Sequence, residues 1–165
     1  MSLIAVAGTL LGSFSTYWFQ QRVARRAEAT ARQERLRQDR LAACSAFAAA
    51  VTDLRRAVIA VWFRERRRDR VFADKDRTPG DKDRALDDYR AAYAESDRLG
   101  AVALGAKFRM LLLLADPGLR ELADVAFRQI DDLRSAVDKA EVGELDVKFE
   151  SHMSAFVSTA AQLLE

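Results

Sequence analysis

The most constraining feature of this chain is a long stretch without helix breakers. Between Gly12 and Pro79 there is neither glycine nor proline, and Ala, Arg, Gln, Glu and Leu supply most of the residues. These residue types favour the α-helix. The 165 residues include only 2 Pro and 7 Gly, so few positions suit the tight turns of a sheet protein. The sequence therefore predicts an all-α fold whose first helix continues to about residue 72.

The opening segment, residues 1–21, contains no charged side chain. Its apolar part, Leu3–Phe19, would be roughly 26 Å long as a helix and would just cross a bilayer. Aromatic rings prefer the headgroup level, and positive charges stay on the cytoplasmic side. We therefore predict a single-pass transmembrane anchor in the plasma membrane, with the C-terminal domain cytoplasmic. The alternative is a buried core helix or an interfacial helix, because the span is short. The interface residues would be Tyr17, Trp18, Arg22, Arg25 and Arg26.

Small residues recur every fourth position in the predicted anchor. Gly8, Gly12 and Thr16 share one helix face, and such a stripe lets two helix backbones approach closely. One interpretation is self-association through this face and hence a homo-oligomer. The alternative is that these residues reflect only the composition of membrane anchors.

The residues after the predicted anchor divide into a stalk and the start of a core. Residues 22–40 carry seven basic and three acidic side chains with few apolar ones, which predicts a basic, solvated helical stalk. From residue 41 apolar side chains recur at spacings of three and four, which predicts a core-facing stripe. Residues 64–84 are mostly charged and contain Pro79-Gly80, a turn signal, so the connection to the next helix is placed there. The stripe consists of Phe47, Val51, Leu54, Val58 and Val61.

A second predicted helix begins near Asp83. It contains the apolar stretch Leu99–Ala106 and continues to residue 115. We expect Leu99–Ala115 to be a buried helix of a bundle and not a second membrane crossing, because Lys107 and Arg109 lie in its middle. Asp116 and Pro117 then fit the N-cap and the first position of a third helix.

The third and fourth helices complete the predicted fold. The third helix is expected to reach about Lys139 with Val137 on its apolar face, and Gly143 to mark the next break. Four amphipathic helices with short connections predict an antiparallel four-helix bundle over residues 41–165. The core positions of the last helix would be Leu145, Phe149, Phe156 and Leu163.

Residues for catalysis or cofactor binding are scarce in this sequence. It has one cysteine and one histidine, and it has no phosphate-binding, dinucleotide-binding or zinc-protease motif. We expect His152 to be a hydrogen-bonded structural residue and Cys44 a small buried one. The sequence therefore predicts no enzyme, no cofactor, no metal and no small-molecule substrate.

An arginine run lies in the charged connection of a chain whose first half is basic. Residues 1–84 carry 18 basic and 10 acidic side chains, whereas residues 85–165 carry 9 and 15. Such a run can bind phosphate in nucleic acid or lipid headgroups. The favoured interpretation is a solvated end of the bundle, because acidic residues are mixed in. The possible polyanion contacts are Arg64, Arg66, Arg67, Arg68 and Arg70.

Two segments carry a resemblance to a known family. The opening AVAGTLLGSFSTYWFQQR, followed after the stalk by RLAACSAFAAAVTDLRRAV, resembles small actinobacterial membrane proteins of the KilB type, named after the spread protein of Streptomyces conjugative plasmids. The likeness covers about residues 4–60. It implies a role beside a DNA translocase in plasmid spread, or a chromosomal relative without assigned activity, and it carries over no catalytic residue.

These observations predict a membrane-anchored helical scaffold or accessory protein that acts by contact with an unidentified protein partner, in an assembly that transfers plasmid DNA under one interpretation. One alternative is a nucleic-acid-binding module held at the membrane and binding through its arginines. Another is a toxin-like membrane effector whose anchors assemble into a pore.

Overall fold

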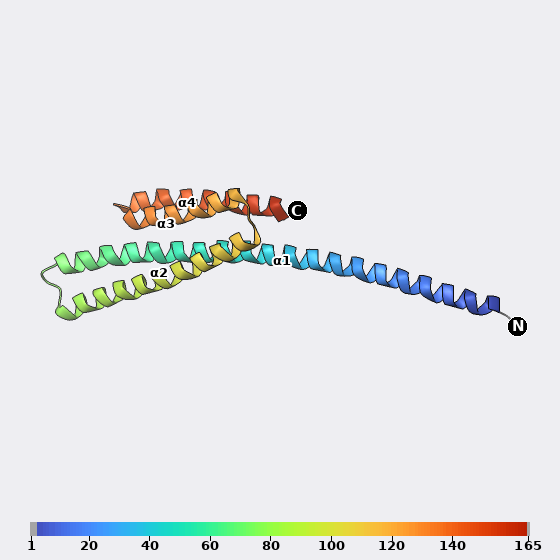
Figure 1. The fold of residues 1–165 in the computed structure, drawn as a ribbon. Helices are drawn as coiled ribbons and strands as arrows, with labels where there is room; N and C mark the ends of the chain where they lie inside the picture. Colours follow the sequence, from blue (N-terminus) through green and yellow to red (C-terminus); the bar gives the residue numbers. More distant parts are fainter. Residues whose placement is uncertain (1–2, 165) are drawn as a thin grey trace. The chain divides into compact units, whose positions relative to one another are not determined.

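The structure, a computed structural model, describes residues 3–164, and it describes side chains for residue 28 and residues 30–164. Within this range the chain is helical and has no strand, so the predicted all-α class is confirmed. Figure 1 shows the helices and their short connections. Their bounds are α1 Leu3–Ala73, α2 Pro79–Leu113, α3 Pro117–Ser135 and α4 Lys139–Leu164.

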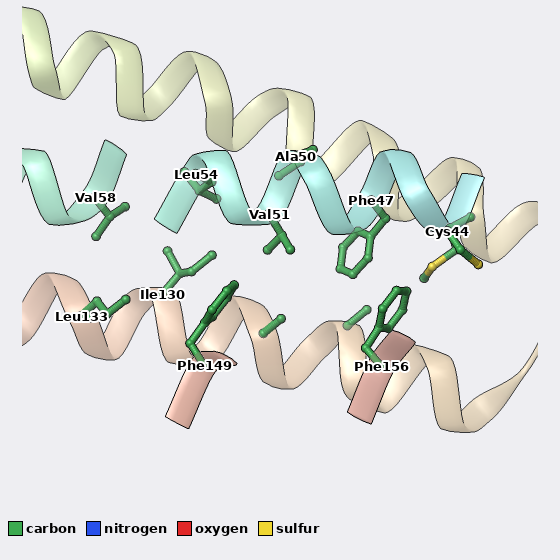
Figure 2. Packing of buried hydrophobic residues seen from close by; sticks show 14 of the residues in the cluster. Cys44, Phe47, Ala50, Val51, Leu54, Val58, Ile130, Leu133, Phe149 and Phe156 are labelled. Carbon is green, nitrogen blue, oxygen red and sulfur yellow. The ribbon is translucent and has the colours of Figure 1, made fainter. Parts of the chain in front are cut away.

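The chain forms two compact units, residues 1–39 and residues 40–165. In the larger unit, the α1 segment from Arg40 to Ala73 lies between α2 on one side and the α3–α4 pair on the other (Figures 1 and 2). Gly100 of α2 comes close to α1, because a Cβ built on it would lie 3.9 Å from Leu54 Cδ1. The larger unit is therefore a helical bundle built around the second half of α1.

The predicted core stripe of α1 is buried, with one difference. Phe47, Val51, Leu54 and Val58 have relative exposures of 0–2%. Phe47, Val51 and Val58 point toward α3 and α4 (Figure 2), whereas Leu54 reaches Gly100 of α2. Val61 is only half-buried, and Trp62 beside it takes the next core position. The rings of Phe47 and Phe156 lie 5.0 Å apart, which joins α1 to α4. The other fully buried large side chains are Met110, Leu119, Ile130, Leu133 and Phe149.

The connection between α1 and α2 is shorter than the charged sequence suggested. α1 continues to Ala73, and Pro79 and Gly80 are the first residues of α2 and not a turn. The physical reason is a capping box, in which Thr78 Oγ1 accepts from the Asp81 backbone N–H at 3.2 Å and Asp81 Oδ2 accepts from the Thr78 N–H at 3.3 Å. Proline tolerates the first helical turn, so this cap starts α2 four residues before the predicted position.

The connection between α2 and α3 matches its sequence signals. The Asp116 side chain accepts a hydrogen bond of 2.8 Å from the Leu119 backbone N–H, and Pro117 is the first residue of α3. At the preceding helix end, Arg40 Nε donates to the Leu113 carbonyl at 3.2 Å. Arg40 of α1 thus satisfies a carbonyl that the end of α2 would otherwise leave without a partner.

The predicted break at Gly143 is wrong. α3 ends at Ser135, and α4 begins at Lys139, so Gly143 lies inside α4 and Val137 in the connection, where it is 75% exposed. Asp138 sets this boundary, because its Oδ1 accepts from the backbone N–H groups of residues 140 and 141 at 2.8 and 2.9 Å. A carboxylate cap determines the helix start here, and a glycine inside a helix costs only about 1 kcal/mol. Leu163 is also more exposed than predicted, at 43%.

The single histidine and the single cysteine have the structural roles that were predicted. His152 Nδ1 lies 2.7 Å from Gln129 Nε2 and 2.9 Å from the Lys148 carbonyl oxygen. It therefore joins α4 to the buried polar side chain of α3. Cys44 is buried in the core, and burial raises the pKa of its thiol above the ordinary value.

Among the residues whose side chains are described, no helix is both long and apolar enough to span a bilayer. The predicted anchor, residues 1–21, lies outside that set.

Candidate functional site

The outward side of the second half of α2 carries a row of apolar residues. A helix repeats every 3.6 residues, so positions 101, 104, 105, 108 and 112 fall on one face. Phe108 is 56% exposed, Leu104 42% and Leu112 86%. We call this face the α2 stripe, and it consists of Ala101, Leu104, Gly105, Phe108 and Leu112.

The expectation that the apolar stretch of α2 would be buried is therefore only half right. Ala103 and Met110 are fully buried against the core, whereas Leu104 and Phe108, one to two residues away, are exposed. The stretch is apolar on both faces, and the bundle covers only one of them. Contiguous apolar residues on a helix surface are typical of a binding site for another molecule.

The α2 stripe can be approached closely in its middle. A Cβ built on Gly105 would have no atom within 4 Å, so the backbone is open to the outside there. Ala101, one turn earlier, is exposed as well. Small residues one turn apart let the backbone of a second helix approach closely. The stripe thus has a shallow centre flanked by the larger side chains of Leu104, Phe108 and Leu112.

A hollow adjoins the C-terminal end of the α2 stripe. Its volume is about 520 Å³, and α2 and α3 supply its walls. On its inner side Lys107 pairs with Asp124 and lies 5.1 Å from the centroid of the Phe127 ring. That lysine is therefore used within the bundle. The walls of the hollow are Lys107, Phe108, Leu111, Leu112, Arg120 and Asp124.

Charged residues border the α2 stripe toward the start of the helix. Arg98 Nε and Nη2 donate to the two carboxylate oxygens of Glu95 at 2.8 and 2.6 Å, and these bonds lower the pKa of Glu95. Asp97 is exposed beside them, and Arg90 lies one to two turns earlier with Asp87 at 3.6 Å. The α2 stripe itself is apolar, and side chains of both signs of charge precede it on the same helix.

Two arginines of the predicted polyanion run are paired across α1 and α2. Arg64 Nη1 and Arg67 Nη1 lie 3.4 and 3.3 Å from the same Asp88 oxygen. Each guanidinium is about half exposed, so the pairs contribute little to stability. They nevertheless orient both arginines toward α2.

The other arginines of the run have partners of different kinds. Arg66 Nη2 donates to the Val137 carbonyl at 2.9 Å, and its guanidinium lies 5.2 Å from the centroid of the Trp62 ring. Arg68 pairs with an acidic neighbour and lies 4.4 Å from the centroid of the Tyr89 ring. Arg70 Nε donates to a main-chain carbonyl one turn earlier. The structure therefore does not gather the five guanidinium groups on one surface.

A second hollow at this end of the bundle holds part of the run. It has a volume of about 310 Å³ and lies where α1 passes into the connection. Arg77, which the sequence analysis did not single out, faces it but pairs with Asp74 at 3.2 Å. The polyanion contact stays a prediction, now restricted to this hollow. Its walls are Arg67, Arg70, Val71, Asp74 and Arg77.

The predicted anchor residues lie outside the described side chains. This holds for the predicted self-association face, Gly8, Gly12 and Thr16, and for the predicted interface residues, Tyr17, Trp18, Arg22, Arg25 and Arg26. Among the side chains that are described, no three or more His, Cys, Asp or Glu residues are placed to hold a metal ion.

The sequence analysis missed the α2 stripe, although its signal was present. Leu99–Leu114 is apolar at nearly every position, and a helix of that composition has two apolar faces. Counting both faces would have shown that α1 could cover only one of them.

The family described as KilB plasmid transfer protein matches residues 41–164. No curated protein and no solved structure matches the chain. The matched range contains α2, α3, α4 and the core-forming part of α1. The resemblance described in the sequence analysis covered about residues 4–60, which lie mostly before the matched range.

Proposed function

Because the chain belongs to the KilB plasmid transfer protein family, we propose that it is a membrane-anchored accessory protein of plasmid transfer that acts by binding other proteins. The observation that carries the binding role is the α2 stripe. It is a helix face inside the family range whose apolar side chains remain exposed after the bundle has formed.

The α2 stripe has the features of a protein contact. Removal of exposed aromatic and aliphatic side chains from water is the dominant favourable term in most protein–protein association. Phe108 and Leu112 are of this kind, and the adjoining hollow gives a partner side chain a place to enter. The proposed role therefore needs binding alone and no catalytic step.

The membrane part of the proposal is supported by residues 1–21. They form an uncharged stretch of sufficient length, followed at once by three arginines, and this order is typical of an anchor whose following domain is cytoplasmic. The proposal is that the anchor holds the bundle at the inner membrane surface, where a transfer assembly can meet it. Carbonate extraction tests this part: the full chain should stay with the membranes, and a chain lacking residues 1–21 should be released.

A plasmid transfer assay with a charged substitution in the α2 stripe tests the binding role. Leu112→Glu should lower the transfer frequency about tenfold, because a buried apolar contact is worth roughly 1–2 kcal/mol and a carboxylate there would be desolvated. Folding should be unaffected, since Leu112 is already 86% exposed. The matched control is Val147→Glu in α4, where the wild-type side chain is 68% exposed and lies outside the stripe. Equal transfer by both variants at equal protein levels would contradict the proposal.

A further inference from the structure

We infer that the α2 stripe binds the α2 stripe of a second copy of this chain, with the two helices parallel and in register. This inference rests on the proposed function, because it names the partner of the same surface. Its evidence is the order of small, large and charged residues along α2.

The size of the side chains fits a second helix of the same kind. In a parallel pair in register, each stripe residue lies beside its own counterpart across a twofold axis. Ala101 and the open backbone at Gly105 then allow close approach at the centre. Leu104, Phe108 and Leu112 would pack around that centre, so these three exposed apolar side chains would be covered together.

The charges decide between the two directions of pairing. Successive residues in a helix are about 100° apart, so Asp97 and Arg98 lie on opposite edges of the stripe. Two to three turns earlier the order is reversed, because Arg90 lies on the edge of Asp97 and Asp87 on the edge of Arg98. Of these four residues, one edge thus carries Arg90 followed by Asp97, and the other edge carries Asp87 followed by Arg98.

In a parallel pair the edge with Arg98 on one copy faces the edge with Asp97 on the other. Arg98 then lies beside Asp97, and Asp87 lies within about one turn of Arg90, on both sides of the pair. In an antiparallel pair each edge would face the same edge of the other copy, and Arg98 of one copy would lie opposite Arg109 of the other. Opposite charges across an interface favour one register and like charges disfavour another. The charge pattern therefore selects the parallel pair.

The inferred dimer should be weak in solution. The α2 stripe has five residues, whereas a standard stable interface uses about 20–30 residues on each side. Two copies held in one membrane would meet at a much higher effective concentration.

Disulfide crosslinking of single-cysteine chains tests the pairing. The full chain is reconstituted in lipid vesicles in a Cys44→Ala background, so that no other thiol is present. Ala101→Cys and Leu112→Cys lie about 16 Å apart along α2. A parallel pair in register brings each cysteine to its own counterpart, so both variants should crosslink to themselves. Ser151→Cys, exposed on α4, is the control and should give only background crosslinking.

Other outcomes of this experiment overturn the inference. An antiparallel pair would crosslink a mixture of Ala101→Cys and Leu112→Cys chains and could not let both variants crosslink to themselves. Crosslinking of both variants at the level of Ser151→Cys would exclude a second copy at this face. If Leu112→Glu still lowers plasmid transfer in that case, the stripe binds a different protein and the proposed function stands.

An exchange of charges distinguishes specific pairing from random collisions between chains, because the yield of crosslinking from random collisions would not change. Asp97→Arg should lower the crosslinking of Ala101→Cys about fivefold, because it places like charges across both edges of the pair. Adding Arg98→Asp in the same chain should restore the crosslinking, since the two signs are then exchanged on both copies. Equal crosslinking by all three chains would contradict the parallel register.

Discussion

Thr78 and Asp81 determine where α2 begins, and one hydrogen bond couples them to pH. Thr78 Oγ1 donates to Asp81 Oδ2 at 2.8 Å, and this bond holds the pKa of Asp81 below its ordinary value of 3.8. A carboxylate whose pKa is lowered by folding stabilises the folded state above its ordinary pKa. That contribution is lost as the pH falls through the lowered value.

We predict that the first turn of α2 frays at acid pH. The backbone chemical shifts of residues 79–84 should move toward coil values as the pH falls below about 4. Asp81→Asn should already show part of this fraying at pH 7 and a weaker dependence on pH. Thr78→Ala should lower the free energy of unfolding by about 1 kcal/mol, because it removes the N-cap side chain. A first turn that is equally ordered at pH 7 and pH 3 in the wild-type chain would contradict this account.

Arg55 shows how a charged side chain can belong to the core region. Its Nε lies 3.2 Å from Asp146 Oδ1 and its Nη1 3.1 Å from Glu150 Oε1, while its guanidinium lies 5.3 Å from the centroid of the Phe149 ring. The Arg55 side chain is 14% exposed and Asp146 31%, so solvent screens this pair less than the pair with Glu150, which is 65% exposed. Arg55 thus fixes the position of α4 against α1, which a pattern of apolar residues does not indicate.

At the level of the helices, the sequence predicted those features that depend only on residues close together in the chain. The end of α1, the buried stripe from Phe47 to Val58 and the Asp116 cap follow from spacing and capping preferences within a few residues. The prediction placed the α3–α4 boundary wrongly because Asp138 and Gly143 are both signals of a helix boundary. In the structure the boundary is at the Asp138 cap, and Gly143 lies inside α4. Two competing local signals cannot be ranked without the packing of the helices they would create.

The exposure of half of α2 could not be predicted for a different reason. Its apolar residues occupy both faces, and the choice of the buried face depends on the side chains that α1 presents. Gly100 opposite Leu54 allows a close approach on one face, and this pairing joins residues far apart in the sequence. The sequence therefore predicts the α2 helix, but it does not predict which face of that helix stays exposed as a candidate binding surface.

The arginine run at the end of the bundle should bind duplex DNA more weakly than its sequence suggests. Five phosphate contacts would give a slope of log affinity against log salt of about −4.5. Three arginines face the hollow at the end of α1, namely Arg67, Arg70 and Arg77, so we expect a slope no steeper than about −2.7.

Two substitutions distinguish DNA binding by the arginines of the hollow from binding by the whole arginine run. Arg77→Ala should reduce any salt slope by about one, whereas Arg64→Ala should leave it unchanged, because Arg64 is not one of the walls of the hollow. Titrations with a duplex between 50 and 200 mM salt give both values. A slope near −4.5 in the wild-type chain would contradict the restricted contact.

At the scale of the whole molecule, the family match and the core coincide. The range 41–164 begins where the buried stripe of α1 begins and ends at the last residue of α4. What the family shares is therefore the bundle, and the α2 stripe lies within it. The anchor and stalk precede this range, so their roles depend on the sequence arguments and on the extraction experiment.

The central claim is that the α2 stripe is covered by protein while the plasmid is transferred. A photoreactive phenylalanine analogue placed at position 112, and separately at position 147, measures this directly in transferring cells. The account predicts discrete protein adducts from position 112 and none above background from position 147. If position 112 gives no more adduct than position 147 while transfer proceeds at the wild-type frequency, the stripe is not a binding surface and the account is wrong.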